Sequence, residues 1–325
     1  EELKPLVDFF ASKEVGEMYG DAALAIGHEY DEDRLVMPDS KEARMSVVPF
    51  LHDAGIDISK LSQRAIDRLE MLHENTRHFR DELQSVEYIR RISDYIAKHD
   101  SARAFEDGEI EQIIVGTIFS DIGKTGPRGA TQEQIQVITD MYGIDEKVSP
   151  NDTVAEFIQK FFPYRAPEMI DDYNGVSGID SDMTMREFWD QHVYWSYDII
   201  QYTGLPVDGI IAAATHHIME GNIPIDMDEH GIIHALGVER KVGRPEVFVM
   251  MLDKYDAQIR RGGRTHDQAI AYLYDRVRHN KLLDQIDDGG ELSALMVSCI
   301  RDIDMALMLQ EDAKDLDSAS AMAAK

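Results

Sequence analysis

Three imidazoles, two carboxylates and one lysine stand in four short segments of this chain, and their side chains together suit a metal centre. In chain order the segments are Ser120-Asp121-Ile122-Gly123-Lys124, His192, the pair His216-His217, and Asp253. Imidazole and carboxylate ligands together favour Mn or Fe over a thiolate-rich zinc site or an all-oxygen magnesium site. We therefore expect one, two or more divalent ions, Fe or Mn, where these segments meet.

These residue types can together hydrolyse a phosphate ester. Two metal ions about 3.5–4 Å apart clamp the phosphate and share a hydroxide, a stronger nucleophile than water at neutral pH. Asp121 is the natural bridging ligand, because a carboxylate has two oxygens, and His192 and Asp253 would add ligands from neighbouring helices. His216 and His217, adjacent on one expected helix, would point about 100° apart and therefore face different ions, or one ion and the substrate.

Each of these side chains also has an ordinary structural interpretation. Lys124 follows Asp121 by three residues, on the same helical face, where it could steady the phosphate or the hydroxide as a point charge. Equally, Asp121 could cap a turn and Lys124 could complement a helix C-terminus. His192 lies among aromatic residues and could be a core histidine bonded to a carbonyl. His216 and His217 follow an apolar stretch, where burying two imidazoles without partners is costly, so metal binding is favoured there.

The composition narrows the class of protein and of partner. With 325 residues, 43% of them hydrophobic, the chain can bury a sizeable core. Its 62 acidic residues outnumber the 33 basic ones, for a net charge of -29, so the surface repels long DNA or RNA, whereas divalent ions could still attract a small phosphorylated substrate. The single cysteine, Cys299, excludes an intramolecular disulfide framework, and we expect it to be buried. No apolar run reaches the ~20 residues that span a bilayer and no signal peptide is visible, so we expect a cytoplasmic protein without membrane contact.

Apolar residues recurring three and four positions apart predict a mostly helical, all-α protein. The expected helices span 61–83, 86–97, 110–119, 188–202, 207–217, 245–260, 266–278 and 291–310. A short hairpin is expected within 226–238, near Gly231. We divide the chain into an N-terminal helical segment (1–60) that could pack on the core or mediate a homodimer, a helical domain (61–310), and an acidic, Ala-rich tail (311–325).

Several of these segments resemble motifs of a known superfamily. The stretch Tyr88-Ile-Arg-Arg-Ile92 and the later SDIGK resemble the two opening motifs of the HD phosphohydrolase superfamily, a histidine followed further along by a His-Asp pair. The helix around His192, the string HHIMEGNIP from His216, and LDKYDA around Asp253 resemble the HD-GYP branch, whose members hydrolyse cyclic dinucleotides. The resemblance covers roughly 86–278, interrupted by an apparent insertion at about 128–183. It implies an HD-type helical bundle and a phosphodiesterase that uses a metal-bound hydroxide on a nucleotide or cyclic dinucleotide.

Two imidazoles of that family are missing from this chain. Tyr88 stands where the first family histidine is expected, and Ser120 stands where the His-Asp pair has its histidine. On the helix before Tyr88, His73 or His78 could substitute, with Glu74 as a companion carboxylate. The Gly-Tyr-Pro signature is also absent, because the chain reads GNIP after the paired histidines.

Two arginines are candidates for contact with the substrate. Arg264 lies in the densest basic stretch of this acidic chain, and Arg186 precedes His192 on the same expected helix. A guanidinium donates two parallel hydrogen bonds to a phosphate, although either arginine could equally pair with a surface carboxylate.

Two functions other than hydrolysis stay open. A sensor or scaffold that binds a nucleotide or a protein partner without turnover would account for Tyr88 and Ser120. A di-iron oxygenase could use the same HD scaffold, although such enzymes generally depend on the histidine that Ser120 replaces.

Overall fold

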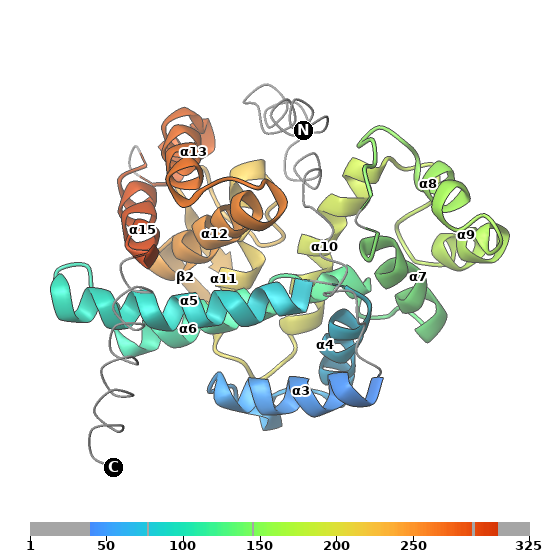
Figure 1. Cartoon of the computed structure of the whole chain (residues 1–325), viewed down its shortest axis with the longest axis horizontal. Helices are drawn as coiled ribbons and strands as arrows, with labels where there is room; N and C mark the ends of the chain where they lie inside the picture. The colour runs from blue at the N-terminus through green and yellow to red at the C-terminus, as the bar shows by residue number, and fades with distance from the viewer. Residues whose placement is uncertain (1–39, 77, 145, 288–289, 305–325) are drawn as a thin grey trace, which may run out of the picture.

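The computed structural model describes residues 40–304 except 77, 145, 288 and 289, and confirms the expected all-α architecture (Figure 1). The side chains of residues 40–46, 78–80 and 261 are also not among the described parts of the chain. Most of the expected N-terminal segment (1–60) and the whole expected tail (311–325) likewise lie outside the described residues. The helices are α3 (Ser40–Asp53), η3 (Ile58–Lys60), α4 (Gln63–Asn75), α5 (His78–His99), α6 (Asp107–Phe119), η4 (Ile122–Thr125), α7 (Gln132–Tyr142), α8 (Val154–Phe161), α9 (Ala166–Asn174), α10 (Met185–Ile200), α11 (Val207–Ala214), η5 (Ile218–Glu220), α12 (Arg244–Asp256), the π-helix η6 (Ala257–Arg261), α13 (His266–His279), α14 (Lys281–Ile286) and α15 (Glu291–Arg301). Among the described helices, none combines the length and the apolar content needed to cross a bilayer.

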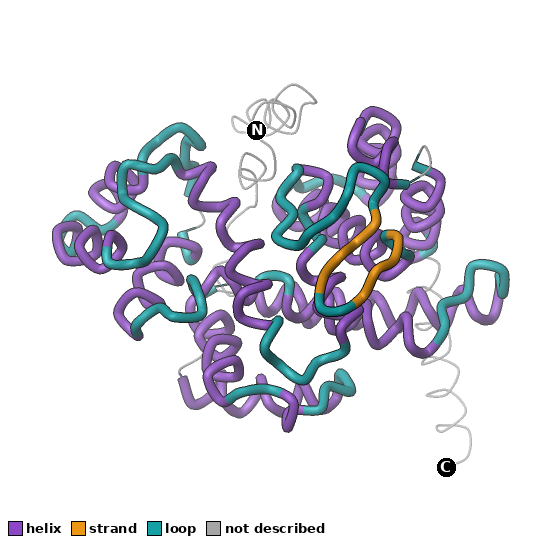
Figure 2. The backbone as a smooth tube through the Cα atoms, turned by 180° about the vertical axis from the view of Figure 1, so that it is seen from behind, coloured by secondary structure: helices purple, strands orange, loops and turns teal. Residues whose placement is uncertain are grey.

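One hairpin interrupts the helices, with β1 (Ile232–Ala235) paired antiparallel to β2 (Val238–Lys241), and Figure 2 shows its two strands beside the helices. The expected hairpin is therefore present, although it continues to Lys241, beyond the predicted range of 226–238. The chain turns at Leu236 and Gly237, whose φ angles of 53° and 80° suit a two-residue hairpin turn. Gly231 comes before β1, where its φ of 76° and the 2.8 Å between an added Cβ and Ile286 Cβ both require glycine.

Two hydrophobic cores organise the helices. The larger core contains buried side chains of α3 to α6 and of α11 to α15. The smaller core lies among α7, α8, α9 and part of α10. Figure 1 shows α7, α8 and α9 gathered at one end of the molecule. They fall within the stretch expected as an insertion. Helix α10 contributes to both cores, because Phe188 is buried in the smaller one and Ile200 in the larger one.

Four helices begin with the same local signal, a threonine followed three residues later by Glu or Gln. In each capping box the threonine hydroxyl accepts from the backbone N–H of the third helical residue, whose side chain accepts from the threonine N–H in return. The pairs are Thr131 with Gln134, Thr153 with Glu156, Thr184 with Glu187 and Thr265 with Gln268. Local sequence therefore determines where α7, α8, α10 and α13 begin.

Small residues bring α6 and α11 unusually close together. A Cβ added to Gly116 of α6 would lie 2.8 Å from Ala212 Cβ, and one added to Gly209 of α11 would lie 2.6 Å from Val115 Cγ1. Both distances are far below van der Waals contact, so only glycine fits at these two positions. The backbones of α6 and α11 therefore approach each other closely there. This contact brings the ends of α6 and α11 together, and the candidate site lies there.

Replacing Gly116 with Ala should lower the free energy of unfolding by about 1–3 kcal/mol, because the added methyl overpacks the contact with Ala212 and Val249. Gly108→Ala, on the same helix, is the matched control because no atom lies within 4 Å of its added carbon. It should leave stability unchanged or raise it by about 0.5–1 kcal/mol. Urea denaturation followed by circular dichroism measures both variants, and equal effects would contradict the close packing.

Candidate metal centre

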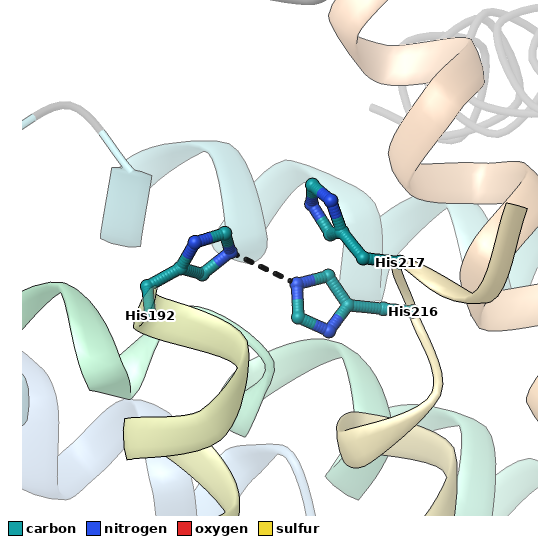
Figure 3. Close-up of side chains that lie close together, drawn as sticks. All are labelled: His192, His216 and His217. Atoms are coloured by element: carbon teal, nitrogen blue, oxygen red, sulfur yellow. Dashed lines mark hydrogen bonds between the residues drawn. The ribbon is translucent and has the colours of Figure 1, made fainter. Parts of the chain in front are cut away.

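Three histidines lie close together in the structure, His192 from α10 and His216 and His217 from the turn that follows α11 (Figure 3). One ring nitrogen each from His192, His216 and His217 lies within 4.8 Å of the other two. The expectation that His216 and His217 diverge along one helix is wrong, because α11 ends at Ala214 and the chain turns before η5. Their rings are 4.4 Å apart at 82°, and both belong to the same cluster.

Backbone carbonyls determine which nitrogen of each ring faces the cluster. The Nδ1 of His192 lies 2.5 Å from the carbonyl oxygen of Trp189, and the Nδ1 of His216 lies 2.7 Å from that of Ala213. A carbonyl can only accept, so both Nδ1 atoms carry the proton. The two Nε2 atoms then face each other at 3.2 Å with a lone pair each, an arrangement that a cation between or beside them would stabilise.

Burial keeps these imidazoles neutral. It lowers the pKa of His192 to about 3, with the nearby Lys124 ammonium acting in the same direction. Burial is also the main reason that the pKa of His216 is lowered and that of His217 lies well below its ordinary value; the Lys254 ammonium adds to the effect on His217. Neutral imidazole is the form that binds metal ions.

Both predicted carboxylates lie beside the histidines. The Oδ1 of Asp121, between α6 and η4, is 3.4 Å from His192 Nε2 and 4.0 Å from His216 Nε2. The Oδ2 of Asp253, on α12, is 4.0 Å from His217 Nε2. The structure thus brings together all five residues predicted as metal ligands, from four separate parts of the chain.

A lysine accompanies each carboxylate. Lys124, buried on η4, forms an ion pair with Asp121. Lys254 is also buried, with its Nζ 2.9 Å from Asp253 Oδ2 and 3.3 Å from Glu220 Oε2. Sequence reasoning missed Lys254 and Glu220, although both stand inside the LDKYDA and HHIMEGNIP strings that it singled out.

Glycine allows η4 to pack directly on α10. A Cβ on Gly123 would lie 2.0 Å from the carbonyl oxygen of His192, so no other residue fits. Its N–H donates to Ser196 Oγ at 2.8 Å, and that hydroxyl donates to the Ser120 carbonyl at 2.5 Å. The buried Arg68 of α4 donates to carbonyls of the loop that follows η4. These contacts set the distance between Asp121 and the histidine on α10.

Helix α7 also contributes to the surroundings of the centre. Tyr142, at the end of α7, sits edge-on to the His192 ring at a centroid distance of 6.3 Å, and Lys124 Nζ lies 5.9 Å from the centre of the Tyr142 ring. The Tyr142 hydroxyl donates to the carbonyl oxygens of Phe188 and Trp189, at 3.3 and 3.4 Å. Sequence reasoning did not identify this tyrosine, because it is distant along the chain from every motif.

A small pocket adjoins the histidine cluster and contains Asp121 and Asp253 in its wall. It is lined by Asp81, Glu82, Ser85, Thr117, Ser120, Asp121, Val249, Leu252, Asp253, Asp256 and Arg260. Tyr88, which stands in the sequence where the first histidine of the HD family is expected, does not line this pocket. Glu82 and Ser85 are the residues of α5 closest to it in sequence that do. Tyr88 instead packs against the larger core and bonds to Gln84. Ser120 does line the pocket, and its hydroxyl donates to the Thr117 carbonyl at 3.0 Å.

Among the other candidates whose side chains are described, His73, Glu74, Arg186 and Arg264 do not line this pocket. His73 and Glu74 lie near the end of α4, and the His78 side chain lies outside the described residues. Arg264 stacks over Tyr272 at 4.7 Å, and Arg186 lies 6.0 Å from the Trp189 ring centre. The suggested roles of these four described residues in metal or phosphate binding are therefore not supported by contacts at the centre.

No protein-family model matches this chain, and searches of curated proteins and of solved structures each found no significant match.

The buried histidines predict how stability depends on pH in the metal-free protein, prepared with a chelator. Below pH 6.5 the unfolded chain takes up a proton that folded His192, with its pKa of about 3, does not. The free energy of unfolding should therefore fall as pH falls, and His192 alone should account for about 1 kcal/mol between pH 6.5 and 5.5.

Urea denaturation at pH 6.5 and 5.5 tests this sign and size. His192→Gln should remove about 1 kcal/mol of the difference between the two pH values. The matched control is His230→Gln, because the His230 side chain is 76% exposed, and it should leave the difference unchanged. The same pH dependence in His192→Gln and in the unaltered chain would contradict the assignment.

Proposed function

We propose that this chain is a metal-dependent phosphohydrolase of HD type, with a divalent ion, Fe or Mn, bound by His192, His216, His217 and Asp121. The observation that carries the proposal is the pair of buried Nε2 atoms 3.2 Å apart, with the Asp121 carboxylate 3.4 Å from one of them. Three neutral imidazoles and a carboxylate form a mixed donor set that fits Fe or Mn.

The donor set and its surroundings suit hydrolysis of a phosphate ester. A divalent ion bound there supplies Lewis acidity and lowers the pKa of coordinated water. The Lys124 ammonium, buried beside Asp121, is close enough to the centre to attract a phosphoryl oxygen. Carbonyl bonds at Nδ1 hold His192 and His216 in one tautomer and orientation, which lowers the reorganisation needed when ligands bind.

The charge of the chain and the motif resemblance suggest the substrate class. A net charge of -29 disfavours long nucleic acids, so we propose a small phosphorylated molecule, a nucleotide or cyclic dinucleotide, as the substrate. Phosphodiesterase activity is the finer form of the proposal, and it rests on the resemblance of the LDKYDA and HHIMEGNIP strings to HD-GYP motifs.

One observation favours a second candidate, a sensor or scaffold that retains a metal ion without turnover. On the pocket side of Asp121 the nearby residues Ser85 and Ser120 offer hydroxyls rather than imidazoles. A hydroxyl is a weaker metal ligand than an imidazole for Fe or Mn. Bound metal without hydrolysis would support this alternative.

Replacing Asp121 with Asn tests the proposal directly. The variant should lose at least about tenfold in metal affinity and its hydrolysis of bis(4-nitrophenyl) phosphate, because an amide cannot supply the negative charge. Asp94→Asn, an exposed aspartate on α5, is the control and should match the unaltered chain. Metal analysis after reconstitution with Fe or Mn gives the first readout, and the release of nitrophenolate gives the second. Full metal content and activity in Asp121→Asn would contradict the proposal, provided that circular dichroism shows the same helical content.

A further inference from the structure

The pocket beside the histidines contains one carboxyl group that no cation of the protein balances. Five of its lining residues carry carboxyl groups, and Arg260 is the one cationic residue in the lining. Arg260 forms ion pairs with Asp81 and with Asp256. The two carboxyls that contact the histidines pair with buried lysines. Among the described residues, Glu82 is then the acidic residue of this lining that has no ion pair.

Two residues that line this pocket, Glu82 and Thr117, have polar atoms without a hydrogen-bond partner among the described residues. Glu82 is 5% exposed, and both of its carboxyl oxygens lack a partner. Thr117 is 8% exposed, and its hydroxyl also lacks one. Burial, with Asp121 close by, raises the pKa of Glu82 well above its ordinary value, but the oxygens lack partners in either protonation state. Such groups cost stability, and a ligand that donates hydrogen bonds to them would offset that cost.

The size and polarity of the pocket suit a primary ammonium group. The space inside is about 30 Å³, against the ~10–15 Å³ that one water requires, so it has room for an ammonium and the methylene that carries it. An ammonium has three donors, and Glu82, Thr117 and Ser85 offer acceptor oxygens in the lining. Val249 and Leu252 form an apolar part of the wall, against which a methylene can pack.

An inorganic divalent ion suits these groups less well than an ammonium does. Magnesium and calcium ions need about six or more oxygen ligands and the charge of more than one carboxylate. Glu82 alone carries a carboxyl that is not paired with a cation of the protein. One carboxylate balances the single charge of an ammonium, and the hydrogen bonds between them are of the stronger, charge-assisted kind.

We propose that the substrate of the metal centre carries a primary ammonium group on a short carbon chain beside its phosphate, and that Glu82 binds this ammonium. The Oδ1 of Asp121 lies 3.4 Å from His192 Nε2, and Asp121 also lines the pocket. The width of this one side chain separates the two places, so a phosphate at the histidines and an ammonium in the pocket are joined by only a few carbon atoms.

The inference rests on the proposed function, because a phosphate at the histidines needs a metal ion there. It narrows the small phosphorylated substrate to an ester with a short aminoalkyl group. The alcohol on the other side of a phosphodiester lies outside this pocket and can still be a nucleoside.

Binding tests the ammonium site without turnover. Protein loaded with one equivalent of Zn²⁺, which accepts imidazole and carboxylate ligands and has no redox chemistry, is titrated calorimetrically with 2-aminoethyl phosphate and with propyl phosphate. The two esters differ in that a methyl group replaces the ammonium. The unaltered chain should bind 2-aminoethyl phosphate at least about tenfold more tightly than propyl phosphate, and Glu82→Gln should reduce this ratio to about one.

Turnover gives a second readout with the corresponding diesters. Protein loaded with Fe or Mn is supplied with 2-aminoethyl 4-nitrophenyl phosphate or propyl 4-nitrophenyl phosphate, and water displaces nitrophenolate from phosphorus in both. The unaltered chain should favour the amino ester at least about tenfold in kcat/KM, and Glu82→Gln should lose this preference. Glu87→Gln is the matched control, because Glu87 is an exposed residue of the same helix that pairs with Arg91, and it should keep the preference.

The outcomes separate the ammonium site from the proposed function. Equal affinity for the two monoesters in the unaltered chain, or the same preference in Glu82→Gln, would overturn the ammonium site and leave the metal centre standing. A second equivalent of Zn²⁺ that binds the unaltered chain and not Glu82→Gln would assign Glu82 to a metal and overturn it as well. Binding of neither monoester and hydrolysis of neither diester would overturn the proposed function, and this inference with it.

Thermal unfolding separates a ligand-binding residue from a structural one. Without metal, Glu82→Gln should melt at the same temperature as the unaltered chain or at a higher one, because an unpartnered buried carboxyl has been replaced. In Zn²⁺-loaded protein, 2-aminoethyl phosphate should raise the melting temperature of the unaltered chain more than that of the variant. A lower melting temperature of the metal-free variant would indicate a structural role for Glu82 and overturn the proposal.

Discussion

The contact between α6 and α11 is the interaction on which the candidate centre depends. Helix α6 leads directly to Asp121, and α11 leads to His216, so their spacing sets the distance between this carboxylate and this imidazole. Gly116 and Gly209 permit the approach because a side chain at either position would overlap the facing helix. The apolar residues along this contact are buried in the larger core, whose hydrophobic free energy offsets the cost of burying polar groups at the helix ends.

The charges at the centre are balanced locally although the chain as a whole is strongly acidic. Lys124 pairs with Asp121, and Lys254 pairs with Asp253, both lysines being buried. The same ammonium groups disfavour protonation of the adjacent imidazoles, Lys124 at His192 and Lys254 at His217. Ionised carboxylates and neutral imidazoles are the protonation states that a divalent cation needs from its ligands. Global charge and local charge therefore have different consequences in this protein.

The helices α7 to α9 are joined to the centre through α10. Their core contains Phe188, one turn before His192, and Tyr142 from α7 lies edge-on to the His192 ring. A change in the packing of these helices would consequently move an imidazole of the cluster. This connection gives the helices α7 to α9 a part in positioning the centre as well as their own hydrophobic core.

The sequence alone determined the helical class, the starts of several helices and the types of residue at the centre. Hydrophobic spacing and capping boxes are local, so they act without knowledge of the rest of the chain. His216, His217 and Asp253 could be singled out because costly polar groups stand beside apolar stretches. Asp121 and His192 could be singled out only together with these residues and through the motif resemblance. The tertiary structure decided what no local pattern contains. In the folded chain α11 ends before His216, so that the imidazoles of His216 and His217 lie in one cluster. On α5, Glu82 and Ser85 line the pocket and Tyr88 does not. The rotation of α5 about its own axis depends on how its whole apolar face packs against the other helices. The number of residues between two sequence motifs does not determine that rotation.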